Sequence, residues 1–232
     1  MSENPPSNPT LAQRAATVGG LPFIMVVVAI VLVAGSAVTW VVSPNWGKTN
    51  AAAPARDVGS VPGGKAPAQS GTKVLYFLAP NRIQIPKIGA DAPIVTMGEL
   101  ANRELDIPLN PKIVGWWNGG AHPGAAQGSA VLAGHINYAG ITGEMARIGS
   151  LDPGDRVYVS GYLKGKVTKL AFKITGVRTY RKTALPYAQI FDQKVAGRLV
   201  LVTCGGPFDS QTGNYLDNIV AYAVPVSTPT DQ

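Results

Sequence analysis

The chain has 232 residues, of which 46% are hydrophobic and 14% are charged, with a formal net charge of +7. The lysines and arginines are scattered rather than clustered, which favours a basic surface facing anionic material and argues against nucleic-acid binding. Clustered Cys/His residues with metal-ligand spacing and glycine-rich phosphate loops are also missing from the sequence, so we expect no metal and no cofactor.

The first feature along the chain is a long apolar segment after a short polar tail. No Asp, Glu, Lys or Arg occurs between Ala15 and Gly47, and residues 21–42 are almost continuously apolar. About 20 such residues cross the hydrocarbon core of a bilayer as a helix. We therefore predict a tail at 1–18 and one transmembrane anchor at 19–43. A cleaved signal peptide is the alternative, because Ala51–Ala53 offers an Ala-x-Ala element, but signal peptides have shorter apolar cores.

Residues 44–72 are rich in Pro, Ala, Gly and Ser, which is the composition of a flexible linker. From about residue 73 the pattern changes to short apolar runs between turn signals, and no βαβ alternation follows. We therefore predict an all-β domain at 73–228, a closed barrel or a sandwich, with short helices at 143–149 and 186–192. The predicted strands are 74–78, 82–86, 92–97, 130–136, 156–162, 169–177, 199–203 and 219–226.

Two residues with nucleophilic or acid–base chemistry each end an apolar strand. They are Cys204, the only cysteine, and His135. A cysteine attacks as the thiolate and needs an imidazole nearby to balance the proton, so the pair predicts cysteine-based catalysis. Gly205 and Gly206, which follow the cysteine, allow close approach of a peptide backbone. The other reading of a lone cysteine is a small buried core residue, and we read His122, in a Gly/Pro-rich segment, as a loop residue.

Several short motifs, in the same order along the chain, resemble those of the sortase family. Leu201-Val-Thr-Cys204 resembles the strand end that carries the sortase cysteine, and Ala133-Gly-His135 resembles the strand end that carries the histidine. Further pieces that match in order are Arg82–Gly89, Val114–Trp117, His122–Gly124 and Leu151–Val157. Cys204–Asp209 and Tyr215–Asn218 resemble the class F branch of actinobacteria. The resemblance runs over about residues 82–226.

The resemblance implies an eight-stranded, closed β-barrel that is held outside the cytoplasmic membrane by the single N-terminal anchor. It implies a transpeptidase that cleaves an LPxTG-like sorting signal of a secreted protein through a thioacyl-enzyme. The protein then passes to an amine of a peptidoglycan precursor or a pilin. By this resemblance Cys204 is the nucleophile and His135 is the acid and base, while Thr203, Gly205 and Asn218 are expected to contact the substrate.

One departure from the family pattern leaves a second function open. Sortases carry an arginine on the strand after the cysteine strand to stabilise the oxyanion, but no arginine follows Cys204 here. The expected position falls near Ser210 or within 216–218, where Asn218 offers a neutral donor. The candidates to reach the site from other strands are Arg178, Arg181 and Arg198. The chain is thus either an active sortase or a catalytically weak domain that binds sorting-signal peptides. An L,D-transpeptidase would need a Ser/Gly-rich Cys motif that ends in Arg, which this chain lacks.

Overall fold

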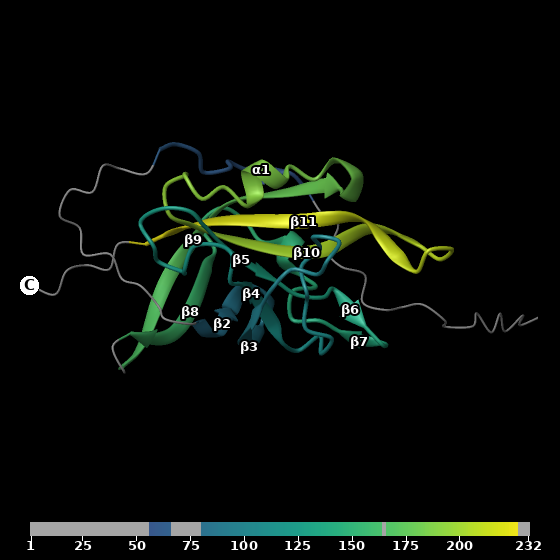
Figure 1. Ribbon diagram of the computed structural model, residues 1–232, viewed down its shortest axis with the longest axis horizontal. Helices are drawn as coiled ribbons and strands as arrows, with labels where there is room; N and C mark the ends of the chain where they lie inside the picture. The colour runs from purple at the N-terminus through teal and green to yellow at the C-terminus, as the bar shows by residue number, and fades with distance from the viewer. Residues whose placement is uncertain (1–55, 66–79, 164–165, 227–232) are drawn as a thin grey trace, which may run out of the picture. The chain divides into compact units, whose positions relative to one another are not determined.

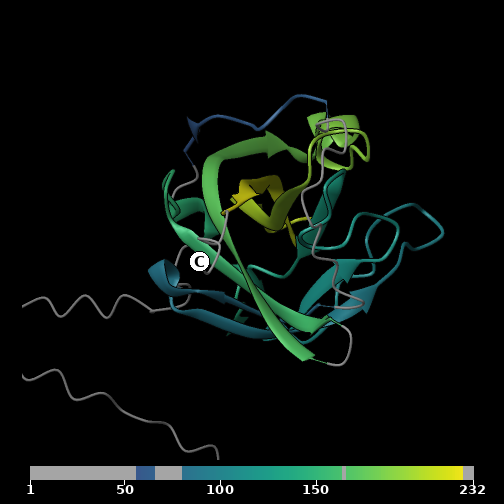
Figure 2. The same ribbon diagram turned by 90° about the vertical axis from the view of Figure 1, so that its left-hand side faces the viewer.

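One sheet curves round and closes on itself to form the body of the structure. The computed structural model describes residues 56–65, 80–163 and 166–226. Nine strands pair in the order β1-β9-β11-β10-β5-β4-β3-β2-β8, and a further antiparallel pairing of β8 with β9 closes eight of them into a barrel. Figure 2 shows the strands curving round this barrel. The predicted all-β, closed eight-stranded architecture is confirmed.

The bounds of the elements follow the alternation of buried and exposed residues along each strand. The barrel strands are β2 (Pro80–Ile85), β3 (Ala90–Met97), β4 (Val114–Trp117), β5 (Ser129–Ala133), β8 (Arg156–Leu163), β9 (Lys166–Arg181), β10 (Arg198–Asp209) and β11 (Asn214–Pro225). The remaining elements are β1 (Val58–Gly59), β6 (Asn137–Tyr138), β7 (Ile141–Thr142), the helix α1 (Tyr187–Ile190) and the 3-10 turns Pro86–Ile88, Ile148–Ser150 and Lys182–Ala184.

Most predicted strands coincide with a barrel strand, with ends that differ by a few residues. Strand β4 was not predicted, and the helix expected at 143–149 is a series of turns that ends in a short 3-10 helix. The helix expected at 186–192 is α1. The strand at 74–78, the polar tail and the anchor at 19–43 lie outside the described residues. Within those residues, no helix has the length and apolar character needed to cross a bilayer.

Apolar side chains cover both faces of the sheet where β5, β10 and β11 meet. Leu132, Leu201 and Ile219 face the barrel interior and belong to its core, while Val200 and Val220, one position along, point outward into a second cluster. The connection from β9 to β10, which contains α1, packs over this outer cluster (Figure 1). Residues buried on both faces explain why these strands appear in the sequence as nearly continuous apolar runs.

Residues 56–65, which fall within the segment predicted as a linker, lie along the outside of the barrel (Figure 2). Val58 and Gly59 pair with β9, and the guanidinium of Arg178 donates to both of their carbonyl oxygens at 2.6 and 2.7 Å. The amide of Ala196, just before β10, donates to the carbonyl of Gly64 at 3.1 Å. We call residues 56–65 the strap, because they connect the edge of β9 to the start of β10.

Candidate active site

Cys204 and His135 follow neighbouring strands that run in the same direction. β10 pairs with β5 in parallel, and the last paired residues are Val202 and Ala133. The amide of Gly134 donates to the carbonyl of Val202 at 3.2 Å, which carries the pairing one step further. Continued by two residues, this register would place Cys204 beside His135. Since side chains alternate along a strand, both point to the outer face, where each is half-buried.

Thr203 connects the two strands by a side-chain hydrogen bond one residue before Cys204 and His135. Its side chain is 2% exposed, and its hydroxyl donates to the carbonyl of Gly134 at 2.8 Å. Thr203 and Gly205 lie on the opposite face from Cys204, and their contact with the substrate stays a prediction. Its observed contact holds in place the backbone from which the His135 side chain extends.

A row of side chains crosses the sheet at the level of Cys204. Asn218 of β11 is directly opposite Cys204, and Tyr180 of β9 is directly opposite Asn218. Side chains that are directly opposite in antiparallel strands have Cβ atoms about 4.5–5.5 Å apart. The Asn218 amide is therefore the polar side chain of the neighbouring strand that is placed to donate a hydrogen bond to a group bound at Cys204.

The imidazole of His135 is held on two sides. The ring of Tyr138 stacks against it, with centroids 5.2 Å apart, and a backbone hydrogen bond with Pro108 orients it. Its Nε2 is buried and has no hydrogen-bond partner among the described residues. Burial lowers the pKa of His135 below 6.5, with the Pro108 bond opposing the shift. The ring is therefore neutral at pH 7 and has a free nitrogen to accept a proton.

Pro108 and Tyr138 are contacts that the sequence did not predict. Tyr138 is exposed and lies in the hairpin β6–β7, whose residue Asn137 donates to the hydroxyl of Tyr215 at 3.0 Å. Tyr215 belongs to β11, so this hairpin is joined to the far part of the β10–β11 hairpin, and both extend from the same end of the barrel (Figure 1). Pro108 comes from the long connection between β3 and β4, and no local sequence pattern predicts its contact with His135.

The glycines after Cys204 serve the packing of the hairpin. A Cβ on Gly205 would lie 2.5 Å from Cδ1 of Ile219, and a Cβ on Gly206 would lie 2.0 Å from Oδ2 of Asp217. Gly206 also has a φ of +71°, and the register shifts here, so that β10 has one extra residue between Gly205 and Phe208. This β-bulge redirects the strand immediately after the nucleophile.

None of the three candidate arginines lies beside Cys204 on its face. Arg178 binds carbonyls of the strap, and Arg198 lies at the start of β10, six residues before Cys204. Nε of Arg181 is 3.4 Å from Oδ1 of Asp217, which pairs with Gly205 and so faces the other side of the sheet. The position on the outer face two residues before Asn218 is occupied by Leu216, which is 38% exposed.

The second histidine has a packing role. The ring of His122 lies against Trp116, with centroids 4.6 Å apart, and burial lowers its pKa below 6.5. Trp116 is buried in the core. Trp117 packs on Phe191 in the outer cluster, and its Nε1 donates to Glu99 at 3.0 Å. The structure therefore places His122 in a loop away from Cys204, as predicted.

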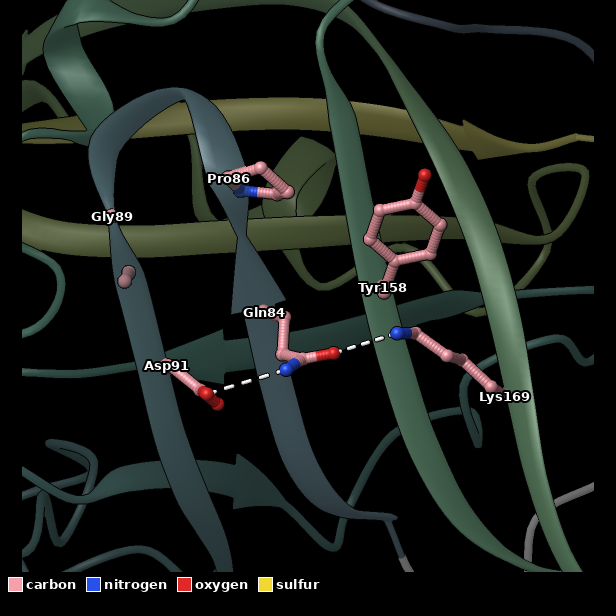
Figure 3. Close-up of a pocket in the computed structure, with 7 residues that line it drawn as sticks. Gln84, Pro86, Gly89, Asp91, Tyr158 and Lys169 are labelled. Atoms are coloured by element: carbon pink, nitrogen blue, oxygen red, sulfur yellow. Dashed lines mark hydrogen bonds between the residues drawn. The ribbon is translucent and has the colours of Figure 1, made fainter.

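A separate cleft of about 270 Å³ lies across β2, β3, β8 and β9 (Figure 3). There Nζ of Lys169 donates to Gln84 at 2.7 Å, and Gln84 donates to Asp91 at 3.2 Å. Asp91 also pairs with Arg82, and Lys169 lies over the ring of Tyr158. Asp91 is thus paired with Arg82 on an exposed surface, and the lining of the cleft includes neither a cysteine nor a histidine. The cleft is therefore distinct from the candidate active site.

Residues 83–226, more than half of the chain, match the family model of the sortase domain. The chain belongs to the sortase family. This match, together with the closed barrel, confirms the family that the motifs indicated. No curated protein matched the chain.

Several solved sortases are similar to this one in structure. A sortase C2 from a pilus island of group B Streptococcus is 22% identical, with a TM-score of 0.47 over 63% of this chain and 73% of that one. Sortase A of Corynebacterium diphtheriae, as a lid mutant, is 19% identical, with a TM-score of 0.46 over 71% and 77% of the two chains. A sortase D5 transpeptidase of Clostridium perfringens is 20% identical, with a TM-score of 0.45 over 64% and 79%. The assignment to the family rests on the sequence match.

Thr203→Val tests whether the hydrogen bond from Thr203 to the carbonyl of Gly134 stabilises the pairing of β10 with β5. The change keeps the shape of the side chain but removes the hydroxyl, which leaves the buried carbonyl of Gly134 without this donor. We expect the free energy of unfolding, measured by urea denaturation, to fall by about 1–3 kcal/mol. Thr203→Ser retains the hydroxyl and is the matched control. Equal losses in the two variants would show that the hydrogen bond does not hold the strands.

The lowered pKa values of His122 and His135 predict how stability depends on pH. The unfolded chain binds more protons than the folded chain at pH values just below 6.5. The free energy of unfolding is therefore not reduced by these two histidines above about pH 6.5, and it declines as the pH falls towards their pKa values in the folded state. We expect the urea midpoint to drop between about pH 7.5 and 5.5. His122→Gln and His135→Gln should each reduce that drop, and a wild-type midpoint that is constant over this range would contradict the prediction.

Proposed function

We propose that this sortase is a cysteine transpeptidase with Cys204 as nucleophile and His135 as acid and base. Members of the sortase family are generally cysteine transpeptidases, and the chain has a sortase domain. The observation that carries the proposal is the parallel pairing of β5 with β10, whose register, continued by two residues, would put the two side chains next to each other on one face. Asn218, opposite Cys204, supplies the polar group across the site.

The reaction begins with proton transfer. The neutral imidazole of His135 takes the proton of the Cys204 thiol, and the thiolate attacks a backbone carbonyl carbon of the peptide. A carbon–sulfur bond forms, the oxygen becomes an oxyanion, and the Asn218 amide donates to it. The imidazolium then gives its proton to the leaving amine as the carbon–nitrogen bond breaks. An incoming amine gives a proton to His135 and attacks the thioester carbonyl carbon. The carbon–sulfur bond breaks, and the released Cys204 thiolate takes the proton from the imidazolium of His135.

The outer face of the sheet supports a peptide with apolar residues before the scissile bond. Val202 lies two residues before Cys204 on the same face, and Leu105 and Leu185 pack at the edges of this surface from two different connections. An LPxTG-like sorting signal of a secreted protein has the apolar character that suits such a surface. The acceptor in this proposal is an amine of a peptidoglycan precursor or of a pilin.

The class and the location belong to the same proposal and rest on the sequence. Cys204–Asp209 and Tyr215–Asn218 resemble the class F branch. The apolar segment within 19–43 is long enough for a single membrane anchor. Such an anchor would hold the barrel on the outer side of the cell membrane, where secreted substrates and the acceptor amine meet.

Leu216 favours a second candidate function, a domain that binds sorting-signal peptides with little turnover. It occupies a position on the outer face near Cys204 where an arginine would reach the oxyanion, and a leucine donates no hydrogen bond there. Removal of one oxyanion donor typically lowers turnover by about 10²–10³-fold. Acylation of Cys204 without release of the acyl group would support this candidate.

Mass spectrometry of the full-length chain, in a nonionic detergent with an LPxTG-type peptide, tests the roles of Cys204 and His135. We expect a covalent adduct on Cys204 that disappears when an amine is added. Cys204→Ala should give no adduct, and His135→Ala should slow adduct formation by about 10²–10⁴-fold, which is the usual contribution of general acid–base catalysis. Circular dichroism provides the control that each variant is folded. An adduct on Cys204→Ala would contradict the assignment of Cys204 as the nucleophile.

Leu216→Arg tests whether a missing charge limits turnover. A guanidinium at this position would lie on the Cys204 face and stabilise the oxyanion, so we expect peptide cleavage to accelerate by up to about 10²-fold. Leu216→Met keeps an uncharged flexible side chain and should leave the rate near that of the wild type. An unchanged or lower rate for Leu216→Arg would mean that Asn218 and the backbone already supply the stabilisation.

A further inference from the structure

Arg198 is a buried cation that has no acidic partner in the described part of the chain. It is 4% exposed, and no carboxylate of the residues at 56–65, 80–163 and 166–226 lies within 4.0 Å of its nitrogens. Nε donates to the hydroxyl of Ser129 at 3.0 Å, and the two terminal nitrogens donate to the carbonyls of Pro62 and Gln189. Buried charges in proteins are normally paired with an opposite charge, so this arrangement requires an explanation.

The surroundings of the guanidinium do not supply that charge. Burial lowers the pKa of Arg198, and the effects of Tyr222, Asp192 and Tyr180 only oppose the shift. The guanidinium lies over the ring of Tyr222, with Cζ 5.4 Å from the centroid. Asp192 directs Oδ1 to the amide of Lys194, at 2.7 Å. Neutral oxygens and a ring face thus hold the cation, and among the described residues its charge is compensated only in part, by Asp192 at longer range.

A cavity of about 450 Å³ opens beside Arg198, between the strap and α1. It is lined by strap residues Pro62 to Lys65, by Gln189, and by the segment that leads into β10. The charged side chains in the lining are Lys65, Lys194 and Arg198, against the single carboxylate of Asp192, so its formal charge is +2. Lys65 and Lys194 are exposed, whereas Arg198 is buried.

We propose that this cavity is a binding site for a phosphate group. A phosphate monoester carries a charge of about −1.5 to −2 at pH 7, which matches the excess positive charge of the lining. A planar guanidinium with donors still unused and two ammonium groups are the side chains that bind phosphate oxygens best. A small anion of lower charge, such as chloride, would leave half of the excess charge in place.

A bound phosphate would join three separate parts of the chain. The strap supplies Lys65, the segment after α1 supplies Lys194, and Arg198 begins the strand that carries Cys204. The ligand would therefore hold the strap against the β9–β10 connection, which packs on the outer face of β5, β10 and β11. Because binding to the folded state alone raises its stability, the thermal midpoint should rise with the concentration of the ligand.

The experiment uses the full-length chain in a nonionic detergent at pH 7. Inorganic phosphate is titrated while its ³¹P resonance and the thermal midpoint of the protein are followed, with sodium chloride at matched ionic strength as the reference. We expect line broadening and a saturable rise in the midpoint with phosphate and neither with chloride. Glycerol 3-phosphate is the second arm: an equal response identifies a site for phosphate esters, and a response to inorganic phosphate alone identifies a site for the free ion.

The matched variants keep Arg198 and change only exposed lysines. Lys65→Gln combined with Lys194→Gln removes two charges of the cavity, and Lys87→Gln combined with Lys173→Gln removes two exposed charges elsewhere. We expect the first pair to weaken phosphate binding about 3- to 30-fold, the range for two surface charge contacts, and the second to leave it unchanged. Equal weakening in both pairs, or no response to phosphate in the wild type, would overturn the proposal, because carbonyls alone would then satisfy Arg198.

Discussion

The parallel register between β5 and β10 is the constraint on which the candidate active site depends. Parallel strands need long connections, and 64 residues lie between the end of β5 at Ala133 and the start of β10 at Arg198, so the two proposed catalytic side chains come together only through the closed barrel. A shift of one residue in either strand would turn Cys204 or His135 to the opposite face. The site therefore requires the register to be fixed strongly at both ends of the pairing.

Two buried polar contacts fix the register between β5 and β10. At the start, the guanidinium of Arg198 donates to Ser129, the residue directly opposite it on β5. At the end, Thr203 donates to the carbonyl of Gly134. Apolar residues fill both faces between these points and would tolerate a shift in register, because one aliphatic side chain replaces another with little specificity. Directional hydrogen bonds in a low dielectric do not tolerate it, since a broken bond leaves a buried polar group unpaired.

Sequence reasoning predicted what local patterns encode. The apolar runs that end at His135 and Cys204 are visible as strands because β5 and β10 are buried on both faces. Strand β4 was missed because it is only four residues long. The extension of β10 beyond Cys204 was also missed, because Gly205-Gly206-Pro207 has the composition of a break, whereas the bulge absorbs it. The contact between Pro108 and His135 joins distant segments, and no periodicity reports such a contact.

The electrostatics of the outer face set this sortase apart from the family pattern. Cys204, Asn218 and Tyr180 form its row, Leu216 lies on the same face two residues before Asn218, and the arginines of β9 are bound to the strap or to Asp217. An oxyanion formed at Cys204 would therefore meet the dipole of an amide instead of a full charge. In a half-buried site, a dipole that is already aligned stabilises the oxyanion without reorganisation of the surrounding groups. It stabilises the oxyanion less than the full positive charge of a guanidinium would. In the proposed mechanism, turnover would depend on how well β11 holds Asn218 opposite Cys204, and the packing of Gly205 and Gly206 against Ile219 and Asp217 would support that position.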